Sequence, residues 1–451
     1  MNAVAPIQDQ ARERYRELLA ATAPELPGQN LEWLRTQRSE ATERFLDKGF
    51  PTRKDEAWRY TSLDKLLEQP VTTRAPAVAG LSESDIEGFA ISAKPAARLV
   101  FVNGVWAPQL SHARGVTDGV QVAGLRAALE RMPEQIGYWL GSAAGTAPTS
   151  FAALNTALLA DGVWIYLPAG VRLSAPIELL YLSSGTDSTL AVSPRNLIVL
   201  ENGAEATVVE HYASYDAANS FTNSLTEIQL GDAARLEHNR LQDEHPLAAH
   251  LSSLFIRQGR ASHYRGLGVS LGGTWSRTEY HNRFGQSDAR CDLDGLYVAG
   301  DRQLTDFHLD IQHAVPGCTS QERFKGILLG RGRAVFDGRI RVEQDAQQTD
   351  AFLSNHNLLL SRDAEVDTKP QLEIFADDVK CAHGTTIGQI EPAQMFYLRS
   401  RGIPEADARR MLSLGFAAEL LADCGVPEFA AHVEGRLQTL LEGDARTSEQ
   451  Q

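Results

Sequence analysis

Short apolar runs that return at a near-constant interval between about residues 160 and 390 constrain the fold of this chain more than any other feature. The runs are rich in Val, Ile, Leu and Tyr, and turns at Gly, Asp and Asn separate them. A small or charged residue followed by alanine and a strand-like run recurs at Ala204, Ala233, Ala261 and Ala289, which are 29, 28 and 28 residues apart. Ala346 follows 57 residues later, close to twice that interval. The chain is therefore expected to be mainly β, with a repeating architecture.

Three β architectures repeat short strands without helices between them: a sandwich, a propeller and a stacked solenoid. A propeller usually repeats its sequence more strongly than this chain does. Each unit here is short, and its turns often fall on Gly, Asp or Asn. The pattern therefore favours the solenoid.

Helical patterns precede the β region. Two helical stretches lie between about residues 8 and 50, and the second is expected to start at an Asn30 cap. In that second stretch Leu34, Ala41 and Phe45 fall on one face, with charged residues on the other. These helices are expected to bury one apolar side.

Helical patterns also follow the β region, after residue 400. Pro404 can occupy the first turn of one helix. A second helix begins at about residue 427, and its apolar residues share a face at i, i+4, i+7 and i+8. They are Val433, Leu437, Leu440 and Leu441. This face has two possible roles: it closes the chain's own core, or it docks a partner.

These changes of pattern divide the chain into three parts. Residues 1–150 form an N-terminal helical and mixed region, residues 151–395 the β core, and residues 396–451 a C-terminal helical region.

Composition excludes several classes of protein. The net charge of −15 argues against a nucleic-acid binder, which needs a basic surface. The opening MNAVAPIQDQ lacks the features of a secretory signal, and no run of roughly 18 uncharged apolar residues is long enough to cross a membrane. Four separated cysteines without a C-x-x-C pair indicate reduced thiols in the cytoplasm.

Most short motifs in the chain are better explained as parts of strands and turns than as catalytic or binding sites. The stretch 268–272 matches the G-x-S-x-G nucleophile elbow, but the residues after it predict a strand and not the required helix. No G-x-x-x-x-G-K-[ST] loop is present, so ATP binding of that kind is not expected. His308, His313 and Cys318 are five residues apart, an odd step that places successive side chains on opposite faces of a strand. We expect neither a catalytic serine nor a metal site here.

The segment from Val379 to Gly384 is the most informative candidate site. If it is a strand, Cys381 and His383 project to the same side as Val379, because residues two apart share a face. A thiolate and an imidazole on one face could bind iron or an iron–sulfur cluster. Two ligands do not fill a coordination sphere, so the others would have to come from distant residues or another chain. From spacing alone, a buried cysteine that acts as a small apolar residue explains the segment better.

Several longer stretches resemble the SufB/SufD family. They are AEVDTKPQLEIFADDVKCAHGTTIGQI (364–390), GTWSRTEYHNRF, the run from Gly317 to VFDGRIRVEQDAQQTDAFLSNHNLLLS, and FYLRSRGIPEADARRMLSLGFA. Together they cover most of residues 265–420, and their combination is highly specific. TRKDEAWRYTSL (52–63) and the Cys-x-His-Gly motif resemble the SufD branch.

The resemblance implies a non-enzymatic scaffold for iron–sulfur cluster assembly. It implies a right-handed parallel β-helix with helical regions at both ends, which pairs with a SufB-like subunit through the β-helix. It also implies a SufC-like ATPase docked on the C-terminal helices. A transient cluster would form at the interface between the two β-helices, with His383 as the matching ligand position and Cys381 beside it as a second candidate. No cofactor would be held firmly by the isolated chain, which is expected to form a homodimer, without nucleic acid or membrane.

The motif departs from the more usual C-S-H-G-A-T of the family at Ala382 and Thr385. On a strand Ala382 faces away from the ligand side, so we expect the site to be kept. Two other functions remain as alternatives. A β-helical carbohydrate-active enzyme is disfavoured because no export signal is seen, and the SufB role is disfavoured because no match to its sulfur-accepting cysteine is seen.

Overall fold

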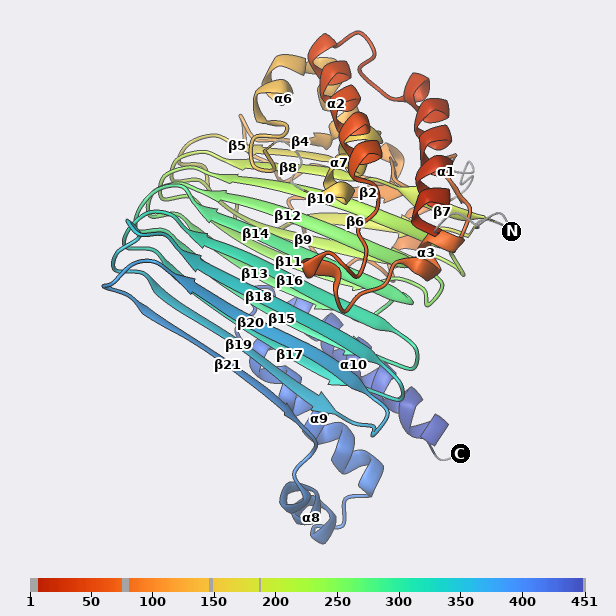
Figure 1. Cartoon of the computed structure of the whole chain (residues 1–451), viewed down its shortest axis with the longest axis vertical. Coiled ribbons are helices and arrows are strands. Elements are labelled where there is room, and N and C mark those ends of the chain that lie inside the picture. The colour runs from red at the N-terminus through yellow and green to blue at the C-terminus, as the bar shows by residue number, and fades with distance from the viewer. Residues whose placement is uncertain (1–6, 75–80, 146–148, 186–187, 449–451) are drawn as a thin grey trace.

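A parallel β-solenoid forms the body of the computed structural model, which describes residues 7–74, 81–145, 149–185 and 188–448. Two sheets lie face to face, and each turn of about eight adds one strand to each sheet (Figure 1). A strand therefore pairs with the second strand after it: Phe221 lies beside Ala249, and Leu304 beside Arg333. The expected solenoid is confirmed. The first six residues of MNAVAPIQDQ lie outside the described residues.

In spatial order, the strands of the first sheet, sheet A, are β20 (Glu365–Ile374), β18 (Arg333–Val342), β16 (Leu304–His313), β14 (Trp275–Phe284), β12 (Ala249–Gln258), β10 (Ser220–Leu230), β8 (Arg195–Leu200), β5 (Val163–Leu167) and β4 (Gln121–Gly124), with β7 (Thr189–Val192) and then β1 (Val71–Thr72) beside β10. Those of sheet B are β21 (Lys380–Gly388), β19 (Asp350–Leu359), β17 (Thr319–Leu328), β15 (Arg290–Ala299), β13 (His263–Ser270), β11 (Arg235–Asp243), β9 (Glu205–Ser214), β6 (Ile177–Ser183), β2 (Ala97–Val102) and β3 (Val105–Trp106).

The helices lie before and after the solenoid strands. Those before them are α1 (Ile7–Thr22), α2 (Glu32–Lys48), α3 (Asp64–Glu68), α4 (Glu83–Ile86), α5 (Leu125–Arg131), α6 (Pro133–Trp139) and α7 (Ser150–Ala157), with short 3-10 turns at Ala23–Glu25, Glu56–Trp58 and Pro108–Leu110. Those after them are α8 (Pro392–Ser400), α9 (Glu405–Leu421) and α10 (Pro427–Ser448).

The turns that lead into six successive strands of sheet B, from β9 to β19, explain the repeat. Each of these six turns has a residue with positive φ, at Gly203, Ala233, Ala261, Asp288, Gly317 and Gln348. Ala204 and Ala289 are the buried residues just after it, whereas Ala233 and Ala261 occupy the positive-φ position itself, at 57° and 54°. The predicted period is correct, but two of the alanines are shifted by one residue because the coils differ slightly in length.

Side chains of both sheets fill the space between them. Near the first coils Phe101, Tyr181 and Tyr212 stack in succession, with ring centroids 4.8 and 4.5 Å apart. Stacked rings of this kind add to the free energy gained by burying apolar area. The inward positions of the strands thus form one continuous core along the solenoid.

Two buried glutamates in that core have opposite environments. Glu210 lies 3.1 Å from His238 and accepts a 3.0 Å hydrogen bond from Arg240. Burial alone would raise its pKa, but these two partners outweigh burial and lower it to about 2. Within the described residues the hydrogen-bond partner of the Glu322 carboxyl group is Ser320, at 3.4 Å, and burial raises its pKa to about 8. Of these two carboxyl groups, Glu210 is therefore ionised and Glu322 protonated at neutral pH.

The N-terminal helices gather at one end of the solenoid, where α7 packs against α2 and β10 (Figure 1). Leu34, Ala41 and Phe45 are buried, as the sequence predicts. The expected Asn30 cap is wrong: Leu31 directly precedes α2, without a side-chain cap. The buried face of α2, and not a capping side chain, therefore holds this helix in place.

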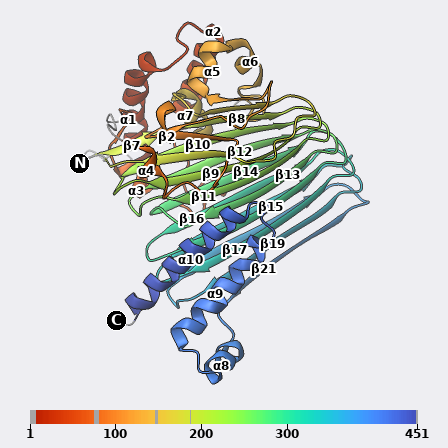
Figure 2. The same cartoon turned by 180° about the vertical axis from the view of Figure 1, so that it is seen from behind.

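The C-terminal helices α9 and α10 lie across the outer face of sheet B (Figure 2). Val433, Leu437 and Leu441 are buried against outward-facing residues of sheet B, and Leu440 packs beside them. The apolar face of this helix therefore closes the chain's own core, one of its two possible roles. Pro404 directly precedes α9.

No helix in the described parts of the chain is both long and apolar enough to span a membrane.

Candidate functional site

The last coil of the solenoid leaves both sheets open. Among the strands of the described residues, β20 pairs with β18 alone and β21 with β19 alone, so each has a free edge. In β21, Lys380 donates its backbone N–H to Thr349 at 2.8 Å. Because donors alternate along a parallel strand, the N–H groups of residues 381, 383, 385 and 387 face outward. A second strand could pair with this edge.

The free edge of sheet A is different. Glu365 donates its N–H to Gly332 at 3.1 Å, so alternate residues from Glu365 face β18 and those between them face outward. Pro370 is one of the outward-facing residues, and it has no N–H to give. A proline on an edge strand interrupts pairing. The edge of β21 is therefore the better surface for strand addition.

His383 and Cys381 lie on this last strand, β21, on the side that faces the inside of the solenoid. Cys381 pairs with Ala351 and His383 with Leu353, both of which are core residues. Val379 and Cys381 pack against the same core, so these residues lie on one face of the strand, as the alternation predicts. Because no coil follows β21, His383 is exposed and Cys381 is half-buried. Both side chains are thus accessible at the mouth of the solenoid.

The Cys381 thiol is held in its protonated form. Burial raises its pKa, and the negative charge of Asp350 raises it further. Metal ligation requires the thiolate. The raised pKa therefore disfavours ligation by Cys381 unless a nearby positive charge stabilises its thiolate.

No group of three or more His, Cys, Asp or Glu side chains within the described ranges could hold a metal ion. His308, His313 and Cys318 do not converge: His313 is buried beside Ser320 at 3.0 Å, and Cys318 donates to the Gln286 carbonyl at 3.5 Å. Ser270 ends a strand and hydrogen-bonds to Gln242, at 2.7 Å, with no helix after it. The structure therefore does not bring His308, His313 and Cys318 together, and Ser270 lacks the strand-turn-helix setting of a nucleophile elbow.

Exposed apolar side chains surround the open end, and sequence reasoning missed them. Phe352, Ile374, Phe375 and Ile387 are each 40% or more exposed, and all lie in the last coils. Ile374 and Ile387 lie on the inner face of the last strands, where a further coil would cover them. Phe352 alternates with the core residues Ala351 and Leu353, so it faces outward from sheet B, and Phe375 lies beside the outward-facing Arg341.

The short helix α8 is a second exposed apolar surface. It projects beyond the solenoid and has no buried residue (Figures 1 and 2). Phe396 is 74% exposed and Tyr397 57%, and Met411 of α9 is 50% exposed. The sequence signal was the run of four apolar residues, Met395 to Leu398, because one helix face cannot bury four consecutive side chains.

The N-terminal segment 52–63 lies along the outer face of sheet A. Trp58 stacks on Trp275 with ring centroids 6.4 Å apart. Thr61 donates a 2.6 Å hydrogen bond to the buried Asp306. Lys369 of the last coil pairs with Glu56. This segment thus connects the N-terminal region with the open end.

Comparison with known proteins covers nearly the whole chain. Residues 9–179 match the family described as SufBD protein N-terminal region. Residues 181–416 match the family described as SUF system FeS cluster assembly, SufBD core domain.

Individual proteins resemble this chain over most of its length. The iron–sulfur cluster assembly protein SufD of Escherichia coli (strain K12) is 34% identical over 423 residues, 91% of this chain and 94% of that protein. A SufBD family iron–sulfur cluster assembly protein of Synechocystis is 33% identical over 86% of each chain. The chloroplastic protein ABCI7 of Arabidopsis thaliana is 30% identical over 90% of this chain and 84% of its own.

Proposed function

This chain belongs to the SufBD family of iron–sulfur cluster assembly proteins and is a homologue of SufD; from that premise we propose that it is a non-enzymatic scaffold subunit. It pairs with a homologous SufB-like solenoid through its open end and carries a SufC-like ATPase on its C-terminal region. The observation that carries this proposal is an uncapped coil that presents outward N–H groups and an exposed His383 on the same strand.

The free edge of β21 supports the mode of pairing. A homologous solenoid ends in strands of the same spacing, so its edge can continue the sheet. The exposed apolar residues Ile374 and Ile387 would be covered by such a partner. When the chain is alone, the same edge pairs with a second copy, which gives a homodimer.

The iron–sulfur cluster is the cargo of this interface. His383 supplies one ligand, and the partner supplies others, because two side chains of this chain do not complete a coordination sphere. Cys381 joins when the arriving iron stabilises its thiolate. A neutral imidazole holds iron less tightly than a thiolate, which suits a cluster that must leave.

The C-terminal region transmits the action of the ATPase. The apolar face of α10 is covered by sheet B, so the docking surface is α8 together with Met411 of α9. Because α9 also packs on the strands β15 and β17, closure of docked ATPases would pull on the coils near the interface. That pull shifts the equilibrium between a closed and an open form of the interface between the two solenoids.

We place the assembled complex in the cytoplasm. The described cysteines are all free, which fits a reducing compartment. The chloroplastic relative makes an organelle the alternative. Fractionation of cells that express the tagged chain decides between the two.

Replacement of His383 by Ala tests the site. The chain is co-expressed with its SufB-like and SufC-like partners, purified without oxygen, and analysed for iron and sulfide. We expect an intact complex whose cluster content falls by about tenfold or more, the usual scale for loss of a metal-site residue. The matched control is His356→Ala, on the neighbouring strand but on its outer face, where the side chain bonds to Thr386 at 2.7 Å. A normal cluster content in His383→Ala contradicts the assignment.

A further inference from the structure

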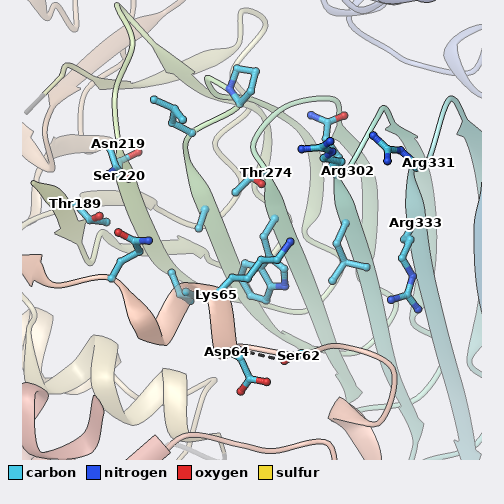
Figure 3. Close-up of a pocket in the computed structure, with 18 of the residues that line it drawn as sticks. Ser62, Asp64, Lys65, Thr189, Asn219, Ser220, Thr274, Arg302, Arg331 and Arg333 are labelled. Carbon is cyan, nitrogen blue, oxygen red and sulfur yellow. Dashed lines mark hydrogen bonds between the residues drawn. The ribbon is translucent and has the colours of Figure 1, made fainter. Parts of the chain in front are cut away.

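A cavity of about 670 Å³ lies between the N-terminal segment and sheet A, away from the mouth of the solenoid (Figure 3). One wall is formed by residues 53–69, including α3. The other is formed by the starts of β10, β12, β14, β16 and β18 and the turns before them. This volume falls in the range of pockets that enclose small organic molecules.

Five cationic side chains line this cavity. Arg53 and Lys65 come from the N-terminal segment, and Arg302, Arg331 and Arg333 come from successive turns of the solenoid. Figure 3 shows Lys65 and these three solenoid arginines. Asp64 is the carboxylate among the lining residues. The whole chain carries a net charge of −15, so this local excess of positive charge runs against its average composition.

Part of that charge is not neutralised. Arg331 is held by Asp301 at 2.9 and 3.1 Å, and Arg333 lies 3.1 Å from Glu365. Within the described residues, no carboxylate lies within ion-pair distance of Lys65 or Arg53. An anion that enters the cavity would meet two cations without a carboxylate partner.

The floor of the cavity has two buried polar atoms that lack a partner. Trp275 is 8% exposed and Ser220 is 2% exposed. Neither the Trp275 Nε1 nor the Ser220 Oγ makes a hydrogen bond within the described chain, and both residues line the cavity. A buried polar group left unpaired costs about 1–3 kcal/mol. Both atoms are potential donors, but each is buried behind the cavity wall, so an acceptor on a ligand reaches them once the neighbouring side chains shift.

The remainder of the floor is apolar. Leu66, Ala249 and Leu304 line it beside the indole of Trp275, which rests on Trp58. The cavity thus combines an apolar surface, two free donors and a cationic rim. A pocket of mainly apolar lining with a few fixed polar groups is the usual form of a small-molecule site.

We propose that this cavity binds a small organic anion with a flat, apolar body. The anionic group, a phosphate, carboxylate or sulfonate, lies between Lys65 and the arginine side chains of the solenoid. The body covers Trp275, and its acceptor atoms take the hydrogen bonds of Trp275 Nε1 and Ser220 Oγ. The site is independent of the cluster interface, since His383 faces the inside of sheet B and the cavity lies outside sheet A.

Two matched probes test this proposal by titration calorimetry on the full chain. One is 1-anilinonaphthalene-8-sulfonate, and the other is N-phenyl-1-naphthylamine, which has the same aromatic body without the charge. We expect the sulfonate to bind about tenfold or more tightly than the neutral probe at low salt, because charge-assisted hydrogen bonds are the strong ones. High salt should remove that advantage.

Variants locate the binding. Lys65→Glu should abolish the preference for the anionic probe, and Trp275→Phe, which keeps a ring but loses the N–H, should weaken the binding of the sulfonate severalfold. Arg283→Glu changes an exposed cation elsewhere on the solenoid and should have no effect. Arg53→Glu serves as a second variant should Lys65→Glu fail to fold. Equal affinity for both probes, or an unchanged affinity for the sulfonate in the folded Lys65→Glu or Arg53→Glu variant, overturns the proposal.

Discussion

The two ends of the solenoid have opposite designs. At the N-terminal end the sheets are closed by the antiparallel strands β3 and β4, and Trp106, Val116, Val120 and Val122 pack against the inner core. At the C-terminal end β20 and β21 have free edges, and core-facing positions such as His383 are exposed. The same repeat thus ends once in a sealed cap and once in an open surface.

The charged side chains at the two ends also differ in burial. At the closed end Glu227, fully buried, accepts hydrogen bonds from Arg195 and from the backbone N–H groups of Gly141, Ala143 and Ala144. At the open end the ion pair of Arg333 and Glu365 is largely exposed. The closed end is held by the chain's own contacts, whereas the open end leaves strand edges and apolar side chains exposed. These are the features on which the proposed pairing surface rests.

The largest difference should appear when one carboxylate is removed at each end. Glu227→Ala leaves Arg195 buried without its partner and frees three N–H groups, so we expect a loss of about 3–5 kcal/mol in unfolding free energy. Glu365→Ala removes an exposed pair and should cost less than about 1 kcal/mol. Urea unfolding followed by circular dichroism measures both. Similar losses for the two variants would contradict the comparison.

The second difference concerns the two core glutamates. The pKa of Glu322 is about 8 in the folded chain against an ordinary 4.5, so the stability that its protonated form provides is complete below pH 4.5 and is lost as pH rises through 8. Glu322→Gln keeps the neutral form, and we expect it to be more stable than the wild type by about 2–4 kcal/mol at pH 8, with little difference at pH 5. Urea unfolding at several pH values tests this.

Glu210 provides the matched opposite case. Its pKa is lowered to about 2, so its contribution is present above pH 4.5 and is lost as pH falls through 2. Glu210→Gln should therefore destabilise the chain at neutral pH, where it leaves Arg240 without its charge partner. A stabilising effect of Glu210→Gln at pH 7, or none for Glu322→Gln at pH 8, would contradict these environments.

The smallest of the three effects compares two exposed aromatic residues. Phe396 of α8 and Tyr138 of α6 are both 74% exposed, but only Phe396 lies beyond the open end. Phe396→Asp should weaken capture of the SufC-like ATPase by about 2 kcal/mol or more, the scale of an interface hot spot, without lowering stability. Tyr138→Asp is the control and should leave capture unchanged. Equal capture by both variants would place the docking surface elsewhere.

Much of the solenoid could be predicted from sequence because each coil repeats the same local pattern. The closed end could not, because most of its strands pair with partners far away in the chain: β4 lies beside β5, and β2 beside β6. Core polar residues such as Arg240 were also missed. Its partner Glu210 stands one coil earlier, and no local pattern shows that the two meet.

The candidate site was found in part by geometry and in part by resemblance. Alternation along a strand correctly placed Cys381 and His383 on one face. Spacing alone favoured a buried cysteine, since nothing local shows that β21 is the last strand. The open end exists because no further strand pairs with β20 or β21 in the described chain. The effect of Pro370 on that edge can be seen only from the hydrogen-bond register of β20, which the sequence does not show.

The most direct test of the open-end interface is Thr385→Pro. The N–H of this exposed residue faces the free edge of β21, so proline should remove an outward donor and keep the bonds to β19, as Pro370 does in β20. Thr385→Ala keeps the N–H and is the control. Co-purification with the SufB-like subunit, measured beside the melting temperature, should show that pairing is lost in Thr385→Pro and kept in Thr385→Ala, with both chains folded. Normal pairing by a folded Thr385→Pro chain would contradict the account.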